Sequence, residues 1–163
     1  HLFNPAAFGV TVATVAGVAA QSWWATTNVW AIAVAGLILA FRLRRLPMVV
    51  AFWLVNLAFL FLSNPALLSA PPVSWFNPAI LFLSLFMLTE PVTGPKSKEA
   101  SIAYGVLLAL FIPPAGLFAG AASVTLALLL TNLFAAPLDF LVLIVKMKGM
   151  MKKMLKSVGG PVK

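Results

Sequence analysis

The segment that decides the fold of this chain runs from Phe76 to Tyr104 and reads FNPAILFLSLFMLTEPVTGPKSKEASIAY. It predicts an apolar helix that begins at Asn77 and ends at Thr89, because asparagine caps helices well and proline suits the first helical turn. A loop with two prolines and a glycine around one carboxylate follows at 90–95, and a second apolar helix begins near Ala100. We therefore expect this polar loop, held between two membrane-length helices, to carry the function.

The composition is that of an integral membrane protein. Of the 163 residues, 63% are hydrophobic and only 9% are charged, whereas a soluble domain averages about 25% charged residues. The chain has no cysteine, which excludes disulfides and thiolate metal sites, and its one histidine is His1. No metal site is therefore expected. No charged segment precedes the first apolar run, so no signal peptide is predicted.

Six apolar segments are candidate membrane spans, each judged against the roughly 20 residues that a bilayer requires. They cover about 6–24, 28–41, 46–63, 75–89, 100–119 and 120–145. The second and fourth are short, which is typical of broken or re-entrant helices around a central site. The predicted fold is an all-α membrane protein in which a polytopic domain, 1–145, precedes a basic tail, 146–163.

The basic residues support this count of spans. The net charge of +8 comes from arginines and lysines at 42–45, at 96–98 and in the tail, and six alternating spans place all of them on one side. The positive-inside rule makes that side cytoplasmic. We expect the protein in the cytoplasmic (inner) membrane with both termini in the cytoplasm. The expected partner of the apolar surface is the lipid bilayer, and no nucleic acid is expected as a partner.

A short internal repeat divides the predicted domain into two halves. The letters FNPA open the first span at residues 3–6 and the fourth span at residues 76–79. Three spans lie between the two starts, so the second half, 74–145, is expected to be inverted relative to the first, 1–73. Inverted repeats with a site between the halves are a transporter architecture. The alternative is that Asn-Pro merely starts a helix in both places.

Two of the three acidic residues lie at informative places. Glu90 ends the fourth span, and Asp139 lies inside the sixth, where an ionisable group is costly and usually functional or paired. For Glu90 the alternatives are a ligand-contacting loop and a simple ion pair with Lys96 or Lys98. For Asp139 they are a functional carboxylate and an ion pair with Lys146.

Other polar features of the apolar segments have structural explanations. Asn132 and Asn56 lie within predicted spans, and hydrogen bonding between helices accounts for both. The tail contains KMKGMMKKMLK, which is basic, methionine-rich and amphipathic. It is expected either to lie on anionic lipid or to form a solvated, partly disordered end.

The order of these motifs resembles one family. The chain contains FNPA at a helix start, then MLTEPVTGPKSKEASIAYG, then LALLLTNLFAAPLDF. This order is similar to the membrane subunit shared by Rnf electron-transport complexes (their D subunit) and sodium-pumping NADH:quinone oxidoreductase (its B subunit). The Thr-Asp-Pro-Val-Thr loop of that family corresponds to 89–93, its Leu-Leu-x-Asn to 129–132, and its Pro-Leu-Ile-Asp to 137–139.

The resemblance implies a urea-transporter-like bundle with inverted repeats and a role in electron transfer, sometimes with ion movement. Glu90 stands where the family has aspartate, and the helices that precede FNPA in the family are absent, so the chain resembles a truncated or minimal member. Nothing at 8–42 matches the family's Ser-Gly-Ala-Thr type motif, whose threonine carries covalent FMN. The implied cofactor is therefore FMN or another flavin, held non-covalently or on a partner. The implied partners are other subunits or a flavin-dependent reductase.

The predicted site combines the two helix starts, the polar loop and two residues of the last span. Cofactor contacts are expected at the helix starts, where the helix dipole favours a phosphate, and along the loop. No residue is predicted to be catalytic, because the chain is expected to be an electron-transfer or non-catalytic subunit of an oxidoreductase complex. The predicted residues are Asn4, Pro5, Asn77, Pro78, Thr89, Glu90, Pro91 and Thr93 for the cofactor, and Asn132 and Asp139 for an ion or proton pathway.

Two other functions stay open from the sequence. The inverted halves are compatible with a channel or transporter for a small solute, which would move solute without an electron donor. The chain is also compatible with a membrane anchor for a cytoplasmic reductase, bound through the basic tail. An anchor predicts that exchange of Glu90 or Asp139 for alanine leaves activity intact.

Overall fold

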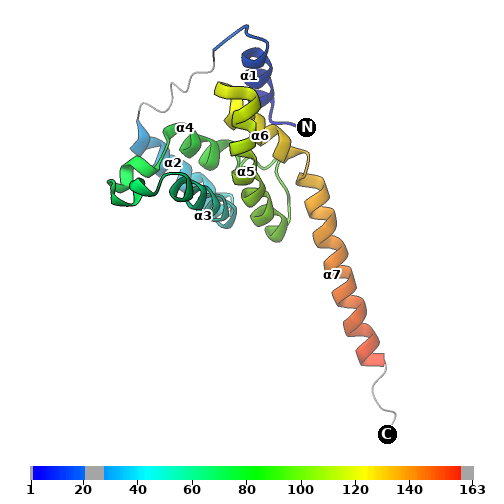
Figure 1. Ribbon diagram of the computed structural model, residues 1–163. Helices are drawn as coiled ribbons and strands as arrows, with labels where there is room; N and C mark the ends of the chain where they lie inside the picture. Colours follow the sequence, from blue (N-terminus) through cyan, green and yellow to red (C-terminus); the bar gives the residue numbers. More distant parts are fainter. Residues whose placement is uncertain (1, 21–27, 159–163) are drawn as a thin grey trace.

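The fold is given by a computed structural model that describes residues 2–20 and 28–158, and these residues form helices and their connections (Figure 1). The helices are α1 (Pro5–Val15), α2 (Val29–Arg42), α3 (Leu46–Ser63), α4 (Pro78–Phe82), α5 (Lys98–Ala119), α6 (Ser123–Asn132) and α7 (Ala135–Val158). The short elements are the 3-10 helices η2 (Pro65–Ser69), η3 (Pro72–Trp75) and η5 (Gly120–Ala122), and the π-helical turn η4 (Leu83–Met87).

Two helices are long and apolar enough to cross a membrane, namely α3 with 18 residues and α5 with 22. A third candidate is the pair of α6 and α7, which is bent by 40° at a short break. Three shorter apolar helices, Pro5–Val15, Val29–Arg42 and Pro78–Met87, occupy the other predicted spans. The all-α membrane fold is therefore confirmed, while two or three of the six predicted spans reach membrane length within the described residues.

The first helix is shorter than predicted. The sequence indicated a span over 6–24, but α1 ends at Val15. Gly17 adopts a φ of 68°, in the left-handed region, and the N–H groups that follow fold back onto the last turn. A glycine in this conformation ends a helix because it has no Cβ to clash. Positions 21–24 of the predicted span lie outside the described residues.

The helix of the organising segment begins where the sequence predicts. The side-chain Oδ1 of Asn77 accepts a hydrogen bond from the N–H of Ala79 at 2.9 Å, and Pro78 is the first helical residue. After Phe82 the helix widens into η4, where the N–H of Leu88 reaches back five residues. Such π-helical turns occur frequently at functional sites.

The turn η4 is tied to α3 by a side-chain hydrogen bond. Trp53 donates from Nε1 to the Oγ of Ser84 at 3.0 Å, and Ser84 in turn donates to the carbonyl of Leu81 at 3.0 Å. The Ser84 side chain is fully buried. A polar group at this depth needs such partners, because lipid and apolar side chains offer none.

The last predicted span, 120–145, is divided into two helices. α6 ends at Asn132 and α7 begins at Ala135. Pro137 lies in the first turn of α7, where its missing N–H is tolerated, whereas inside a continuous helix it would remove a hydrogen bond. α7 then continues to Val158, so residues 146–158 of the predicted tail are helical rather than disordered.

The core lies where α3, α5 and α6 meet. Its largest members are Met48 and Phe52 of α3, Tyr104 and Leu108 of α5, and Leu128 of α6. The backbones of α3 and α5 approach closely at Gly105, where an added Cβ would lie 2.3 Å from the carbonyl oxygen of Met48. Small residues at helix crossings are typical of membrane proteins, because they permit this approach.

The helix α7 extends away from the other helices over most of its length (Figure 1). Its apolar residues recur at helical spacing and are half or more exposed, namely Phe140, Met147, Met151 and Met154. Lysines at 146, 148, 152 and 153 fall on the opposite side of the helix by the same spacing. α7 is therefore an amphipathic helix whose apolar face is largely exposed in the structure.

Candidate functional site

Thr89 closes the helix that leads into the polar loop. Its side chain is fully buried, and its Oγ1 donates to the carbonyls of Leu85 at 2.8 Å and Phe86 at 3.2 Å. These carbonyls belong to the π-helical turn η4. The Thr89 hydroxyl therefore donates to the backbone of its own segment.

Glu90 is the centre of a small polar junction. Its Oε2 accepts hydrogen bonds from the Nδ2 of Asn4 at 2.5 Å and from the Oγ1 of Thr93 at 3.1 Å. Asn4 uses its other amide atom to cap α1, because Oδ1 accepts from the N–H of Ala7 at 2.9 Å. Asn4 and Thr93 are both buried and Glu90 is half-buried. The predicted ion pair with Lys96 or Lys98 is not formed, since amide and hydroxyl donors take its place.

Asp139 is bound to the other end of the same loop. It accepts from the backbone N–H groups of Lys96 at 2.8 Å and Ser97 at 2.9 Å, and from the Ser97 hydroxyl at 2.7 Å. The alternative of an ion pair with Lys146 is not found, because Lys146 pairs with Glu99 at 3.1 Å on the surface. Asp139 therefore fastens α7 to the entry of α5.

A third tie comes from the turn between α2 and α3. Arg45 donates from Nη1 to the carbonyl of Pro95 at 2.5 Å and to the hydroxyl of Ser101 at 2.7 Å. The segment 90–97 is thus held from three distant parts of the chain, by Asn4, Arg45 and Asp139. Pro91 is exposed in this segment and makes no side-chain contact that would place it in a ligand site.

The pair Tyr104 and Asn132 joins α5 to α6. The Tyr104 hydroxyl donates to the Oδ1 of Asn132, and both side chains are at most 1% exposed. The hydrogen bond between helices predicted for Asn132 is therefore present. The Nδ2 of Asn132 is buried without a hydrogen-bond partner in the part of the chain that the structure describes.

The second FNPA motif lies apart from this junction. Asn77 is exposed and lines a cavity of about 520 Å³ with Asn56, Ser63 and Trp75. The ten helical residues 78–87 separate Asn77 from the loop, which corresponds to about 15 Å along the helix. The sequence analysis placed both motifs in one cofactor site, but the structure brings Asn4 to Glu90 and leaves Asn77 and Pro78 at the opposite end of the helix. Pro5 follows Asn4 on the exposed surface.

Two residues at this site were missed from the sequence. Arg45 was assigned to topology alone, and Ser97 was not selected at all. A signal for Ser97 was present, because serine just before an apolar helix is a typical N-cap, and Ser97 does cap α5. No local signal indicates that Arg45 reaches the loop at Pro95, since fifty residues separate them.

The residues predicted to contact a flavin do not form a cradle for one. Asn4, Thr89 and Thr93 use their polar groups on the protein itself, and the negative charge of Glu90 would repel a flavin phosphate. Asn77 and Pro78 line one cavity and Pro5 lines another, away from the junction, whereas Asn4, Thr89, Glu90, Pro91 and Thr93 line none of the four cavities that we identify. No group of three histidine, cysteine or carboxylate side chains that could hold a metal occurs among the described residues.

Comparison with known proteins adds one finding. The model of the NQR2, RnfD, RnfE family matches residues 2–148, which is most of the chain. No curated protein and no solved structure matches the chain.

Proposed function

The chain belongs to the NQR2, RnfD, RnfE family, and from this premise we propose that it supports flavin-mediated electron transfer as a membrane subunit of an Rnf/Nqr-type complex. The flavin, FMN or a related molecule, belongs to a partner subunit, because the polar residues of this chain are engaged with each other. The complex lies in the cytoplasmic membrane, with the basic helix ends on the cytoplasmic side.

The observation that carries the proposal is the junction at Glu90. A half-buried carboxylate stands at the end of a broken apolar helix, oriented by the amide of Asn4 and the hydroxyl of Thr93. An electron that enters a region of low dielectric raises the cost of negative charge there, and a nearby proton or cation lowers it. Glu90 is placed to hold that compensating proton or cation on its other carboxylate oxygen, since Oε2 accepts from Asn4 and Thr93.

The other polar residues support this junction. Asp139 holds the loop through Lys96 and Ser97, so it acts as a positioning residue rather than as a carrier of charge. Asn132 has a free Nδ2 group beside Tyr104 and offers a donor to a bound water. The partner's flavin, when bound, supplies the electron-transfer chemistry itself.

The test compares two variants of the tagged chain purified with its complex. Glu90→Gln removes the charge at the junction, and Glu99→Gln is the matched control, because Glu99 forms an exposed surface pair. We expect Glu90→Gln to slow donor-driven electron transfer by about tenfold, which corresponds to about 1.4 kcal/mol in the barrier. Flavin content, read from the absorption spectrum and from mass spectrometry of the released chromophore, should stay unchanged.

Three outcomes count against this proposal. A purified complex that contains no flavin removes the electron-transfer role. Equal rates for Glu90→Gln and Glu99→Gln remove the junction from the mechanism. Flavin that stays with this chain after the partner subunits are dissociated places the cofactor here and contradicts its assignment to a partner.

A membrane-anchor function is the second candidate, and the course of α7 favours it. Beyond Asp139, which contacts the entry of α5, the helix extends away from the other helices with an exposed apolar stripe and four lysines (Figure 1). Such a helix suits a reductase that must be held beside the membrane. In this case removal of residues 146–158 releases the reductase from membranes, while Glu90→Gln leaves its activity intact.

A further inference from the structure

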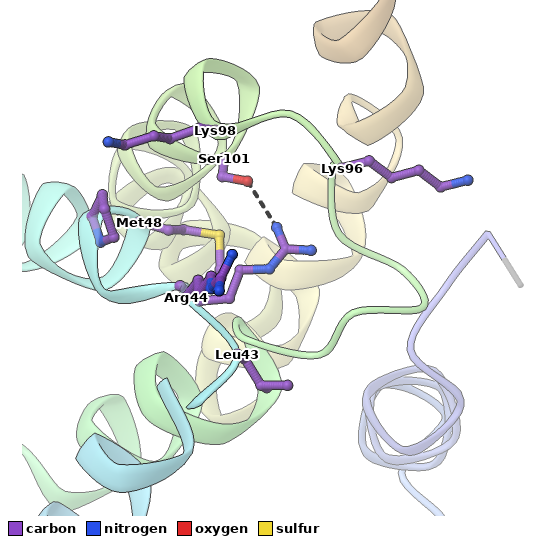
Figure 2. A pocket seen from close by; sticks show the side chains of 8 residues that line it. Leu43, Arg44, Met48, Lys96, Lys98 and Ser101 are labelled. Atoms are coloured by element: carbon purple, nitrogen blue, oxygen red, sulfur yellow. Dashed lines mark hydrogen bonds between the residues drawn. The ribbon is translucent and has the colours of Figure 1, made fainter. Parts of the chain in front are cut away.

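A cavity lined by four cationic side chains lies between the α2–α3 turn and the start of α5. Its volume is about 350 Å³, which is within the usual range of small-ligand sites. Figure 2 shows the turn on one side of the cavity and the loop that leads into α5 on the other. The lining residues are Leu43, Arg44, Arg45, Pro47, Met48, Lys96, Lys98 and Ser101.

The carboxylates of the chain compensate the positive charge of this cavity only in part, because Asp139 attracts Lys96 and Glu99 attracts Lys98 without a close ion pair among the described residues. Glu90 is hydrogen-bonded to Asn4 and Thr93, Asp139 is bound to backbone N–H groups, and Glu99 pairs with Lys146. The contact between Lys146 and Glu99 is the one ion pair that we find within the described residues. Four like charges around one cavity repel each other, so an anion there lowers the free energy.

The two arginines differ in how they are held, because Arg44 is exposed on a strained turn and Arg45 is half-buried and hydrogen-bonded. Arg44 has a φ of 56°, a left-handed conformation that only glycine adopts without strain. Arg45 donates from Nη1 to the carbonyl of Pro95 and to the hydroxyl of Ser101. Its Nε and Nη2 groups remain available as donors. The dashed line in Figure 2 marks the bond to Ser101. Lys96 and Lys98 extend in opposite directions from the loop and flank the cavity.

The place of the cavity indicates what kind of anion it meets. The two helices that are long enough to cross a membrane both begin beside it, α3 at Leu46 and α5 at Lys98. The end of a membrane-spanning helix lies at the level of the lipid headgroups. The N-terminus of α5 also directs the positive end of its helix dipole to this level.

We propose that this cavity binds the phosphate group of an anionic phospholipid. Arginine guanidinium groups suit phosphate oxygens because their donors form a planar fork, and basic pockets between helices are a known means of lipid headgroup recognition. Arg44 and Lys98 contact the phosphate, while Arg45 holds the loop in place and contributes its remaining donors. A bound lipid would thereby fix the α2–α3 turn against the loop that carries Glu90.

The test measures lipid retention by native mass spectrometry. Protein is taken from nanodiscs of phosphatidylcholine that contain a fraction of phosphatidylglycerol, and the bound phosphatidylglycerol is counted. The double variant Arg44→Gln with Lys98→Gln leaves Arg45 and its loop contacts intact. The matched control is Arg42→Gln with Lys148→Gln, which removes the same charge at exposed positions outside the cavity.

We expect the double variant to bind phosphatidylglycerol about tenfold more weakly, and the control to stay close to the unmodified protein. Equal loss in both variants overturns the proposal, because it shows attraction by net charge alone. A melting temperature measured for each variant separates lost binding from lost folding, and a folded double variant that keeps its lipid also overturns the proposal.

Competition by millimolar inorganic phosphate is the second experiment. If inorganic phosphate displaces the lipid from the unmodified protein, the ligand of the cavity is free phosphate, and the proposal of a phospholipid is contradicted.

Discussion

At the scale of single residues, the half-buried carboxylates of Glu90 and Asp139 accept hydrogen bonds from different kinds of donor. Glu90 accepts from the side chains of Asn4 and Thr93, whereas Asp139 accepts chiefly from backbone N–H groups at Lys96 and Ser97. From the sequence, an ion pair with lysine was one of two alternatives for each. Lysine at a membrane boundary extends its charge to water, while backbone N–H groups at a helix entry have no such freedom and must find an acceptor nearby.

The two FNPA motifs allow a matched comparison of asparagines. Asn4→Ala removes both the α1 cap and the strongest contact of Glu90, so we expect a loss of about 2–3 kcal/mol in the free energy of unfolding. Asn77→Ala removes only an exposed cap and should cost about 1 kcal/mol. Denaturant titration of the detergent-solubilised protein measures both. Equal losses would mean that the Asn4–Glu90 contact contributes nothing beyond the cap.

Asp139 should control the order of the loop. In Asp139→Ala the N–H groups of Lys96 and Ser97 lose their acceptor, so hydrogen exchange at these two amides should become about tenfold faster or more. Glu99→Ala is the control, because an exposed ion pair contributes about 0–1 kcal/mol. Exchange that is unchanged in Asp139→Ala would show that Arg45 alone holds the loop.

At the scale of elements, the contact between α3 and α5 depends on a missing side chain. Gly105 faces the backbone of Met48 so closely that a methyl group would overlap its carbonyl oxygen at 2.3 Å. A backbone atom cannot rotate away as a side chain can, so the helices would have to separate. The same crossing carries the buried Tyr104, so a shift here would also disturb its bond to Asn132.

Two alanine substitutions in α5 test this crossing. Gly105→Ala should destabilise the protein by about 2 kcal/mol or more, because it forces the packed backbones apart. Gly116→Ala should be neutral or stabilising by up to about 1 kcal/mol, since nothing lies within 4 Å of the added atom and alanine favours helix. Thermal unfolding in detergent distinguishes them. Similar behaviour of the two variants would show that α3 and α5 separate at little cost.

At the scale of the whole molecule, the organising segment joins parts of the chain that are far apart in sequence. The N-terminal stretch, the α2–α3 turn and α7 each contribute one residue to the loop at 90–97. The loop therefore fixes the relative positions of both halves at one end of the bundle. The inverted relation of the halves stays a prediction.

The sidedness of the bundle can be tested because the chain has no cysteine. Single cysteines at Arg42, Lys98 and Lys148 should all react with an impermeant thiol reagent added to the cytoplasmic side of oriented vesicles. A cysteine at Leu68, beyond the far end of α3, should react only from the other side. Reaction of the cysteines at 42 and 98 from opposite sides would contradict the single basic face and the site built on it.

The sequence by itself determined the membrane class, the helix starts and the importance of the 76–104 segment. These features depend on local chemistry: apolar length, Asn-Pro caps and the proline-rich loop act over a few residues. The ends of helices were harder, as α1 and the break before Ala135 show, because apolar composition alone does not mark where a glycine or proline ends a helix.

Only the tertiary structure decided which polar groups meet. Asn4 and Glu90 lie 86 residues apart, and Arg45 reaches Pro95 across 50. Such contacts depend on how α3, α5 and α6 pack. A sequence pattern with a period of a few residues predicts a helix but not its packing partners. For the same reason the two identical FNPA motifs have different surroundings. One is buried against a carboxylate, and the other is exposed at the opposite end of its helix.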